Sequence, residues 1–224
     1  MYKRQRWSGR PPTDLCSALS GRFPRDRPRQ FLDVGTGFPS MGNVHEVAQS
    51  VHGDARTVYV DYDYDPVVVR HGRALLATDE RTVMLEEGLR KPGQILEQAA
   101  GLLDFGQPVC VLLVACLHFV TAQEDPYRIV KRLMRSTGPG SYLVISHAIK
   151  TARTVAAADA YRDASAPVTL RTETQVGRMF TAAGVEMVEP GLVRVPSWRP
   201  DGSNPLAEND AERVDVLGGV GRKA

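Results

Sequence analysis

A short apolar segment that runs directly into a glycine loop is the feature that most constrains the fold. The segment is Gln30-Phe31-Leu32-Asp33-Val34, and the loop begins with Gly35-Thr36-Gly37. A helix start follows, because Asn43 can cap free backbone N–H groups and Glu46, three residues on, can bond back. Apolar residues then recur at helical spacing, at Val44, Val47, Ala48 and Val51. The sequence therefore predicts a strand, a tight glycine turn and a helix in immediate succession.

This turn predicts a site for a nucleoside cofactor, since free N–H groups and a positive helix end meet at one point. Gly35 and Gly37 would let the backbone approach the ligand, and a side chain at Gly35 is expected to fill the ligand's space. A dinucleotide fingerprint needs Gly or Ala where Ser40 stands. Asp33, just before the loop, instead favours a cationic ligand such as S-adenosylmethionine, which carries an ammonium and a sulfonium. The alternative is a tight turn that binds nothing.

A second acid follows the next predicted strand, the β-rich run from Arg56 to Asp61. Asp61 would lie at the strand tip, where a carboxylate can hold two ribose hydroxyls. Asp63 competes for that role, whereas Asp65 before Pro66 is better explained as a helix cap. A third strand over 82–85 leads into a turn with Glu87, again at the edge where cofactor loops lie.

The most apolar run of the chain, Val109 to Ala115, predicts a central parallel strand that is buried on both faces. Cys116 and His118 leave this strand at its carboxyl end, so His118 could face the reacting end of the pocket. A lone histidine can equally be a polar filler or a packing residue. Further helices are expected over 92–103, after Asp125, over 151–164 and after Thr172, and further strands over 140–146, 185–188 and 214–220. The alternation predicts a doubly wound α/β sheet with a late β addition.

Composition favours one α/β domain over residues 30–224. Residues 1–29 lack any apolar period and contain several prolines, so they are expected to be a poorly ordered tail, or an artefact, because Met1 to Gln5 looks like translated adapter sequence. The formal charge of +2 arises from residues 1–30, which hold eight basic and two acidic residues. The remainder holds 20 basic against 24 acidic residues, which argues against a nucleic-acid partner.

Hydropathy and cysteine usage narrow the class further. No apolar run is long enough for a membrane helix and no secretory signal opens the chain, so a cytoplasmic protein is expected. The three cysteines, Cys16, Cys110 and Cys116, lack zinc-ligand spacing, and the latter two read as small buried hydrophobes. No metal site is therefore expected.

Five segments carry a resemblance that runs from Arg29 to Ala224: residues 29–37, 43–48, 113–120, 140–144 and 218–222. They resemble the actinobacterial S-adenosylmethionine-dependent methyltransferases that were first catalogued as a domain of unknown function. The resemblance implies the Rossmann-like class I methyltransferase fold, with a mostly parallel seven-stranded sheet whose last strand is antiparallel. It also implies that the cofactor lies over the first strands. The chain departs from the family's pattern in its N-terminal residues, in two extra residues around Asp63 and in Gly88, where the family tends to have Asp.

The expected activity is methyl transfer from S-adenosylmethionine to an unidentified, small-molecule acceptor. A sulfonium is already a good leaving group, so the protein mainly aligns the reactants and excludes water, and a base is not strictly required. The expected cofactor residues are Asp33, Gly35, Thr36, Gly37, Asn43, His45, Asp61, Glu87, Ala115 and His118, with His118 also the candidate catalytic residue. One alternative is a non-catalytic module that binds the cofactor or a partner. A nicotinamide oxidoreductase is disfavoured by Asp33 and Ser40.

Overall fold

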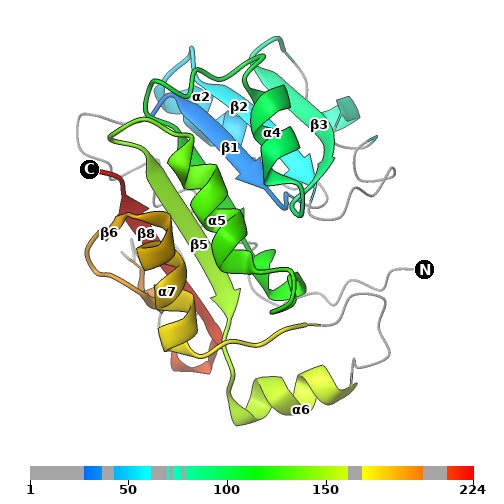
Figure 1. Cartoon of the computed structure of the whole chain (residues 1–224), viewed down its shortest axis with the longest axis vertical. Coiled ribbons are helices and arrows are strands. Elements are labelled where there is room, and N and C mark those ends of the chain that lie inside the picture. Colours follow the sequence, from blue (N-terminus) through cyan, green and yellow to red (C-terminus); the bar gives the residue numbers. More distant parts are fainter. Residues whose placement is uncertain are drawn as a thin grey trace.

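A central sheet organises the part of the chain that the computed structural model describes, which is residues 28–36, 43–61, 70, 73–76, 79–160, 168–198 and 211–224 (Figure 1). Gly37, Asp63, Cys16 and almost all of the expected tail lie outside these residues. The strands are β1 (Gln30–Val34), β2 (Arg56–Asp61), β3 (Thr82–Gly88), β4 (Cys110–Val114), β5 (Tyr142–Ala148), β6 (Glu186–Met187), β7 (Val193–Arg194) and β8 (Val216–Arg222). The helices are α2 (Val44–Val51), α4 (Pro92–Ala99), α5 (Pro126–Arg135), α6 (Ala152–Ala160) and α7 (Glu173–Ala183), with short 3-10 turns η1 (Leu117–Phe119), η2 (Val195–Ser197) and η3 (Ala211–Arg213).

The strand order is β3-β2-β1-β4-β5-β8-β6, and β7 pairs with the far end of β8. Neighbouring strands within the group β1 to β5 run parallel to one another, whereas β8 runs antiparallel to β5. This confirms the predicted doubly wound, mostly parallel sheet and its antiparallel last strand. The described sheet has eight strands rather than seven, because the two-residue β7 also hydrogen-bonds to β8.

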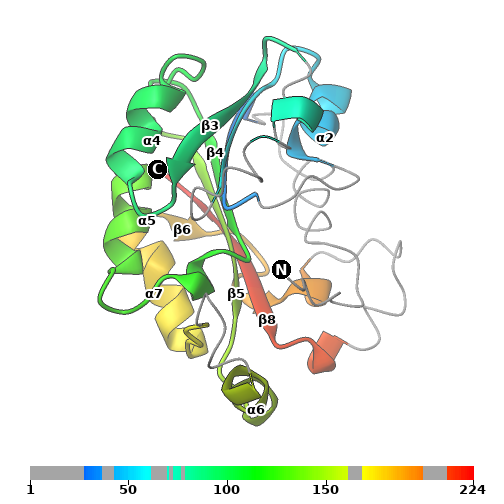
Figure 2. The same ribbon diagram turned by 90° about the vertical axis from the view of Figure 1, so that its right-hand side faces the viewer.

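Helices cover both faces of the sheet (Figure 2). On one face α4, α5 and α7 bury an aliphatic core against alternate residues of the strands, such as Leu32, Val111 and Ile145. On the other face Val44 of α2 packs over Tyr59, Leu112 and neighbouring side chains. β4 lies between these two cores with Cys110 to Leu113 buried, which confirms the prediction of a central strand without a solvent face.

The helix starts follow from the predicted caps. The Asn43 N–H donates to the Glu46 carboxylate at 2.8 Å, and the Asp125 carboxylate accepts from the Arg128 N–H at 3.0 Å. Thr172 and Gln175 form the capping box that opens α7. The helix ends were harder to predict, and α4 stops at Ala99 instead of continuing to residue 103. There the Gly101 N–H bonds three residues back, to the Gln98 carbonyl at 3.1 Å, so the chain tightens into turns.

Ordered pairing begins one residue before β1. The Arg56 N–H donates to the Arg29 carbonyl at 2.8 Å, and the Arg29 guanidinium pairs with Asp54 at 2.7 Å. Cys110 and Cys116 are buried free thiols, as predicted, and burial raises the pKa of each thiol. No helix in the described ranges is long and apolar enough to span a membrane.

Glycines of β8 set how closely the end of α7 approaches the sheet. A Cβ built on Gly221 would lie 2.4 Å from Val185 Cγ2 and 3.1 Å from Phe180 Cδ1. Real Cβ atoms do not come that close to other carbons, so a side chain here would have to push α7 and its following loop away from the sheet. Gly177, in contrast, has nothing within 4 Å of its Cβ position.

These two glycines give a matched test of the packing. Gly221→Ala should lower the free energy of unfolding by about 1–3 kcal/mol, because it overpacks the contact with Val185. Gly177→Ala, in the middle of α7, should raise it by about 0.5–1 kcal/mol, because alanine restricts the unfolded chain and favours the helix. Urea denaturation of both variants checks the pair. Equal effects of the two substitutions would contradict the close packing of β8 and α7.

Candidate functional site

The carboxyl ends of β1, β2 and β4 meet at one edge of the sheet. β1 has β2 on one side and β4 on the other, so the sheet changes winding direction at β1, and open α/β sheets bind ligands outside the strand ends at such a point. Asp33 pairs with Tyr59 and Val34 with Val60 in the register of β1 and β2. Asp61, the next residue of β2, therefore lies beside the turn that begins at Gly35. The structure brings both predicted acids to the same edge.

Asp33 is half-buried near the end of β1. Its neighbours Leu32 and Val34 belong to the core under α4, α5 and α7, so alternation directs Asp33 toward the face that carries α2. Burial raises the pKa of Asp33 to about 7, and a side-chain hydrogen bond from Thr36 partly opposes this shift. The Thr36 hydroxyl also lies 3.2 Å from the Asp33 main-chain carbonyl, to which it donates. A carboxylate that is costly to ionise by itself is suited to receive a cationic group.

Gly35 turns the chain sharply after β1. Its φ is +91°, and its N–H donates to the Val60 carbonyl at 2.8 Å. A Cβ here would lie 2.3 Å from Cys116 Cβ and 2.9 Å from its Sγ. A side chain at Gly35 would therefore collide with Cys116 and disturb the fold itself, which corrects the expectation that it would affect only the ligand's space; the effect on the ligand stays a prediction. The thiol of Cys116 in turn donates to the Val34 carbonyl at 3.3 Å.

Asn43 and His45 hold α2 in place beside this turn. Asn43 is the helix cap, as described above. His45 is buried, and both its backbone N–H and its ring Nδ1 lie 2.9 Å from the hydroxyl of Tyr59 on β2. Burial lowers the pKa of His45, so the ring is neutral and its Nδ1 can accept a hydrogen bond from the Tyr59 hydroxyl, whose oxygen accepts one from the His45 backbone N–H. These contacts give Asn43 and His45 structural roles, and the contact of either residue with the cofactor stays a prediction.

Glu87 lies against α4, near the end of β3. Gln98 donates to its carboxylate at 2.9 Å, and Lys91 lies 3.6 Å from its other oxygen. The neighbouring residue Gly88 pairs with Asp61, so Glu87 belongs to the same edge of the sheet even though its polar partners are on α4. Its predicted role toward the cofactor is untested by these contacts.

Ala115 marks the exit from β4. It is exposed and has a φ of +53°, which costs a residue with a Cβ about 1 kcal/mol or more. Its N–H is held by Ser146 on β5, which accepts at 3.0 Å through Oγ and at 3.3 Å through the carbonyl. Non-glycine residues in this conformation concentrate at functional sites, so the strained backbone supports the prediction that places Ala115 in the pocket.

His118 lies on η1, directly after this exit. It is partly exposed, but its Nδ1 is buried without a hydrogen-bond partner among the described residues. Its ring centroid is 4.4 Å from that of Phe119 and 5.7 Å from that of His147 on β5. Burial, helped by His147 and Arg171, lowers the pKa of His118 to about 3. His118 is therefore neutral near pH 7, and a base this weak is poorly suited to remove a proton.

Arg171 and His147 lie next to the predicted residue His118, and the sequence analysis did not propose either of them as a site residue. Arg171 precedes α7, and Ile149, just after β5, forms a parallel bridge with it. One guanidinium nitrogen donates to the Leu117 carbonyl and to His147 Nε2, both at 2.9 Å, and the other donates to the Val120 carbonyl at 2.7 Å. The arginine thus fastens the η1 turn to β5. Nothing in the local sequence marks Arg171, because these contacts cross more than 20 positions.

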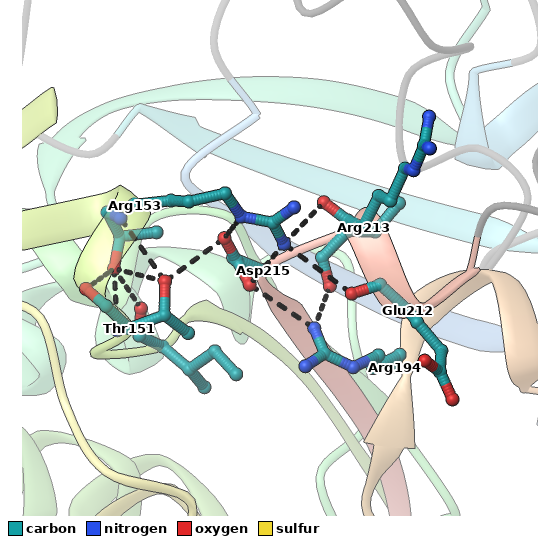
Figure 3. A network of polar contacts seen from close by, with 9 residues as sticks. Thr151, Arg153, Arg194, Glu212, Arg213 and Asp215 are labelled. Atoms are coloured by element: carbon teal, nitrogen blue, oxygen red, sulfur yellow. Dashed lines mark hydrogen bonds and ion pairs between the residues drawn. The ribbon is translucent and has the colours of Figure 1, made fainter.

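A second polar network joins three elements at the same end of β5 (Figure 3). Asp215, just before β8, accepts two bonds of 3.0 Å from Arg153 on α6 and one of 3.1 Å from Thr151. Arg194 on β7 lies 3.3 Å from the same carboxylate. The hydrogen bond from Arg153 is the main reason that the pKa of Asp215 is lowered. This network anchors α6 below the sheet edge, where Figure 1 places it.

The described residues contain no group of three or more His, Cys, Asp or Glu side chains that could hold a metal ion. The edge of the sheet carries an acid near the tip of each of β1 and β2, a glycine turn after β1, and the exposed residue Ala115 in a strained conformation after β4. This donor set fits a ligand with an ammonium and a ribose. Together with the strand order, it defines a class I methyltransferase fold.

Comparison with known proteins identifies the family. A family model described as S-adenosyl methyltransferase matches residues 25–224. The chain belongs to this family of S-adenosylmethionine-dependent methyltransferases, and its cofactor is S-adenosylmethionine. The predicted resemblance is thereby confirmed. A comparison with curated proteins gave no significant match.

Two crystal structures are similar over nearly the whole chain. One is a Thermobifida fusca YX protein assigned as a methyltransferase, with 35% identity and a TM-score of 0.82, covering 95% of this chain and 78% of that one. The other is a DUF574 family protein from Streptomyces avermitilis MA-4680, with the same identity and TM-score, covering 95% and 81%. The mitomycin 7-O-methyltransferase MmcR shares the fold alone, at 16% identity and a TM-score of 0.60, covering 95% and 54%.

The raised pKa of Asp33 predicts a pH dependence of cofactor binding. Between about pH 5 and 7 the free protein holds a proton on Asp33 that a bound ammonium would displace, so affinity should rise with pH, by up to about tenfold per unit, and level off above about 7. Calorimetric titration with S-adenosylmethionine over this range measures the effect. Asp33→Asn should bind more weakly and lose this slope.

The control for that experiment is Asp54→Asn, which removes an exposed acid paired with Arg29 at the amino end of β2. Its titrations should follow the wild-type profile. A slope that persists in Asp33→Asn would assign the proton to another group.

Proposed function

We propose that this methyltransferase acts on a small-molecule acceptor, with the cofactor bound across the carboxyl ends of β1, β2 and β4. The observation that carries the proposal is the register of β1 and β2, which puts Asp33 and Asp61 at one edge on either side of the Gly35 turn. One acid can pair with the ammonium of the cofactor and the other with its ribose hydroxyls.

The remaining predicted residues take supporting roles in this proposal. Gly35 and Thr36 begin the turn under the cofactor, and Gly37, the next residue in sequence, is also assigned to cofactor contact. Asn43 and His45 hold the helix α2 in place. Glu87 stands at the end of β3. Ala115 and His118 border the edge from which the methyl group leaves. Asp33 and Asp61 are the two side chains whose charge acts on the ligand directly.

The bound cofactor supplies an activated methyl group on a positively charged sulfur. The protein's part is to hold the acceptor in line with that methyl group and to keep water away. His118 is neutral near pH 7, so it can accept or donate a hydrogen bond to the acceptor without adding charge. No residue of the edge is required to take up a proton when the acceptor is already ionised or is a neutral amine.

Two observations support a small acceptor. Apart from residues 1–30 the chain is slightly acidic, which does not favour nucleic acid. Two structures with the same fold are an O-methyltransferase family protein from Burkholderia thailandensis and MmcR, a mitomycin 7-O-methyltransferase, although the likeness to both concerns the fold alone. The rival from another class is a module that binds the cofactor without transferring its methyl group.

The test is incubation of the full chain with S-adenosylmethionine carrying a ¹³C-labelled methyl group and with a bacterial small-molecule extract. Transfer of label into extract components, absent without protein, is the expected result. Cofactor binding without any transfer would favour the non-catalytic module. Binding of NAD in place of S-adenosylmethionine would contradict the assignment of the edge.

Asp61 rather than Asp63 is proposed to hold the ribose. Asp61 is 1% exposed and still part of β2, so the sheet holds its backbone at this edge. Two charge-assisted bonds to ribose hydroxyls imply that Asp61→Ala weakens cofactor binding by about 1.5–3 kcal/mol, or roughly ten- to a hundredfold. Asp63→Ala should cost much less. Calorimetry on both variants, side by side, decides, and a larger loss at Asp63 would transfer the role to that residue.

A further inference from the structure

Arg171 is a buried cation in an unusual setting. It is 4% exposed, and its three described hydrogen bonds go to two backbone carbonyls and a histidine ring. No carboxylate of the described residues lies within ion-pair distance of it. A buried charge is costly unless it is paired, and the usual partner of a buried arginine is an acid. The fold here keeps a positive charge that carbonyl dipoles solvate but do not neutralise.

The groups between Arg171 and the sheet edge do not neutralise it either. His147 accepts from the guanidinium through Nε2, and its Nδ1 lies 2.7 Å from the Ala148 carbonyl, to which it donates. This pattern needs a neutral ring with the proton on Nδ1, and burial lowers the pKa of His147 to about 4. His118, packed edge-on against His147 at 5.7 Å, is also neutral near pH 7. The positive charge therefore acts through two uncharged imidazoles on whatever lies beyond His118.

The cluster lies at the carboxyl end of β4 and β5, on the other side of β4 from the two acids. η1 follows the β4 exit directly, and Arg171 fixes that turn at both ends, through the carbonyls of Leu117 and Val120. Asp33 and Asp61, which suit the cofactor, lie on β1 and β2, whereas the cluster lies on β5 and the segments beside it. The edge is thus acidic at β1 and β2 and basic beyond β4.

We propose that the acceptor is bound and methylated as an oxygen anion, a phenolate, enolate or carboxylate, and that buried Arg171 selects for it from beneath His118. This inference rests on the proposed function, since it specifies the acceptor of the same reaction. An oxyanion next to His118 compensates the unpaired charge of Arg171. The Nδ1 of His118 is buried and has no hydrogen-bond partner among the described residues, so no carboxylate of these residues pairs with this nitrogen in place of an acceptor.

The charge balance of the transfer favours the same class. The acceptor loses its proton to solvent on binding, its oxygen lone pair forms the new O–CH3 bond, and the S–CH3 electron pair stays on sulfur. A cation and an anion become two neutral products, and no base is needed in the step. Methylation of a neutral amine would instead move the positive charge from sulfur onto nitrogen, closer to Arg171, which a low-dielectric site opposes.

The experiment uses the full chain, ¹³C-methyl S-adenosylmethionine and a bacterial small-molecule extract separated by ion exchange into anionic, neutral and cationic fractions. The anionic and weakly acidic components should accept label, and the chemical shift of the new methyl carbon should identify O-methyl products. Labelled N-methyl amines as the main product would overturn the inference while leaving the proposed function intact. No labelled product at all, from protein that binds the cofactor, would overturn the proposed function and this inference with it.

Variants separate the charge of Arg171 from its role in holding the turn. Arg171→Gln should lower transfer to the acceptor about tenfold or more, with unchanged cofactor affinity, and Arg171→Lys should retain part of the rate and the preference for oxygen. The matched control is Arg178→Gln, which removes the same charge from the exposed face of α7 and should transfer at the wild-type rate.

The pH profile provides a readout that a structural role alone would not move. Loss of the positive charge should raise the pKa of the bound acceptor, so the rise of kcat with pH should shift to higher pH in Arg171→Gln. His118 and His147 have pKa values of about 3 and 4 and do not titrate in this range. If Arg171→Gln does not fold, the Arg171→Lys profile and the product class of the wild type decide. Wild-type rate and profile in a folded Arg171→Gln would overturn the inference.

Discussion

The turn after β1 is the constraint on which the site depends. Three strands meet there, because the Gly35 N–H bonds to β2 through Val60, while Cys116 from the end of β4 fills the place of a Gly35 side chain. The φ of +91° and the absent Cβ are both needed for this arrangement. The ladders of β1 with β2 and β4 bring the three strand ends together, and Gly35 lets the chain turn away in the narrow space between them. Strand pairing then places Asp61 at the tip of β2, and Ser146 on β5 holds Ala115 at the exit of β4.

Electrostatics divide the edge into two halves. Asp33 and Asp61 stand on the side of β1 and β2, and Arg171 stands beneath η1 on the side of β5. The separation matches a reaction in which a cationic methyl donor meets an anionic acceptor. Both histidines of the cluster are neutral mainly because burial disfavours their charged forms, and the nearby charge of Arg171 lowers their pKa values further.

Local signals in the sequence predicted much of the fold. The apolar run of β4 is buried on both faces as expected, and caps at Asn43, Asp125 and Thr172 open helices where predicted. The end of α4 and the extra strand β7 were missed, because the turn hydrogen bonds near Gly101 and a two-residue pairing to β8 leave no periodic pattern. Such features depend on contacts that periodicity does not encode.

The site was predictable only in its local part. The acid and glycines of β1 are adjacent in sequence, so their chemistry could be read directly, and the edge position of Asp61 followed from strand order. The contact of Gly35 with Cys116 and that of Arg171 with His147 join residues far apart in the chain. The position of His45 after the loop predicted that it contacts the cofactor. Its hydrogen bond with Tyr59 could not be predicted, because it depends on how α2 packs against β2.

The groups proposed to act on ligands are those that cost the free protein stability. Asp33 has a folded-state pKa of about 7 against an ordinary value of 3.8, so the folded state keeps a proton that the unfolded chain releases, and stability falls as pH rises from about 4 to 7. Arg171 is buried without an acid, and Ala115 holds a left-handed backbone. A cationic cofactor would relieve the first of these costs and an anionic acceptor the second. Binding both ligands together should therefore stabilise the fold by more than either ligand alone. The cofactor supplies a positive charge next to Asp33, and the acceptor supplies a negative charge near Arg171.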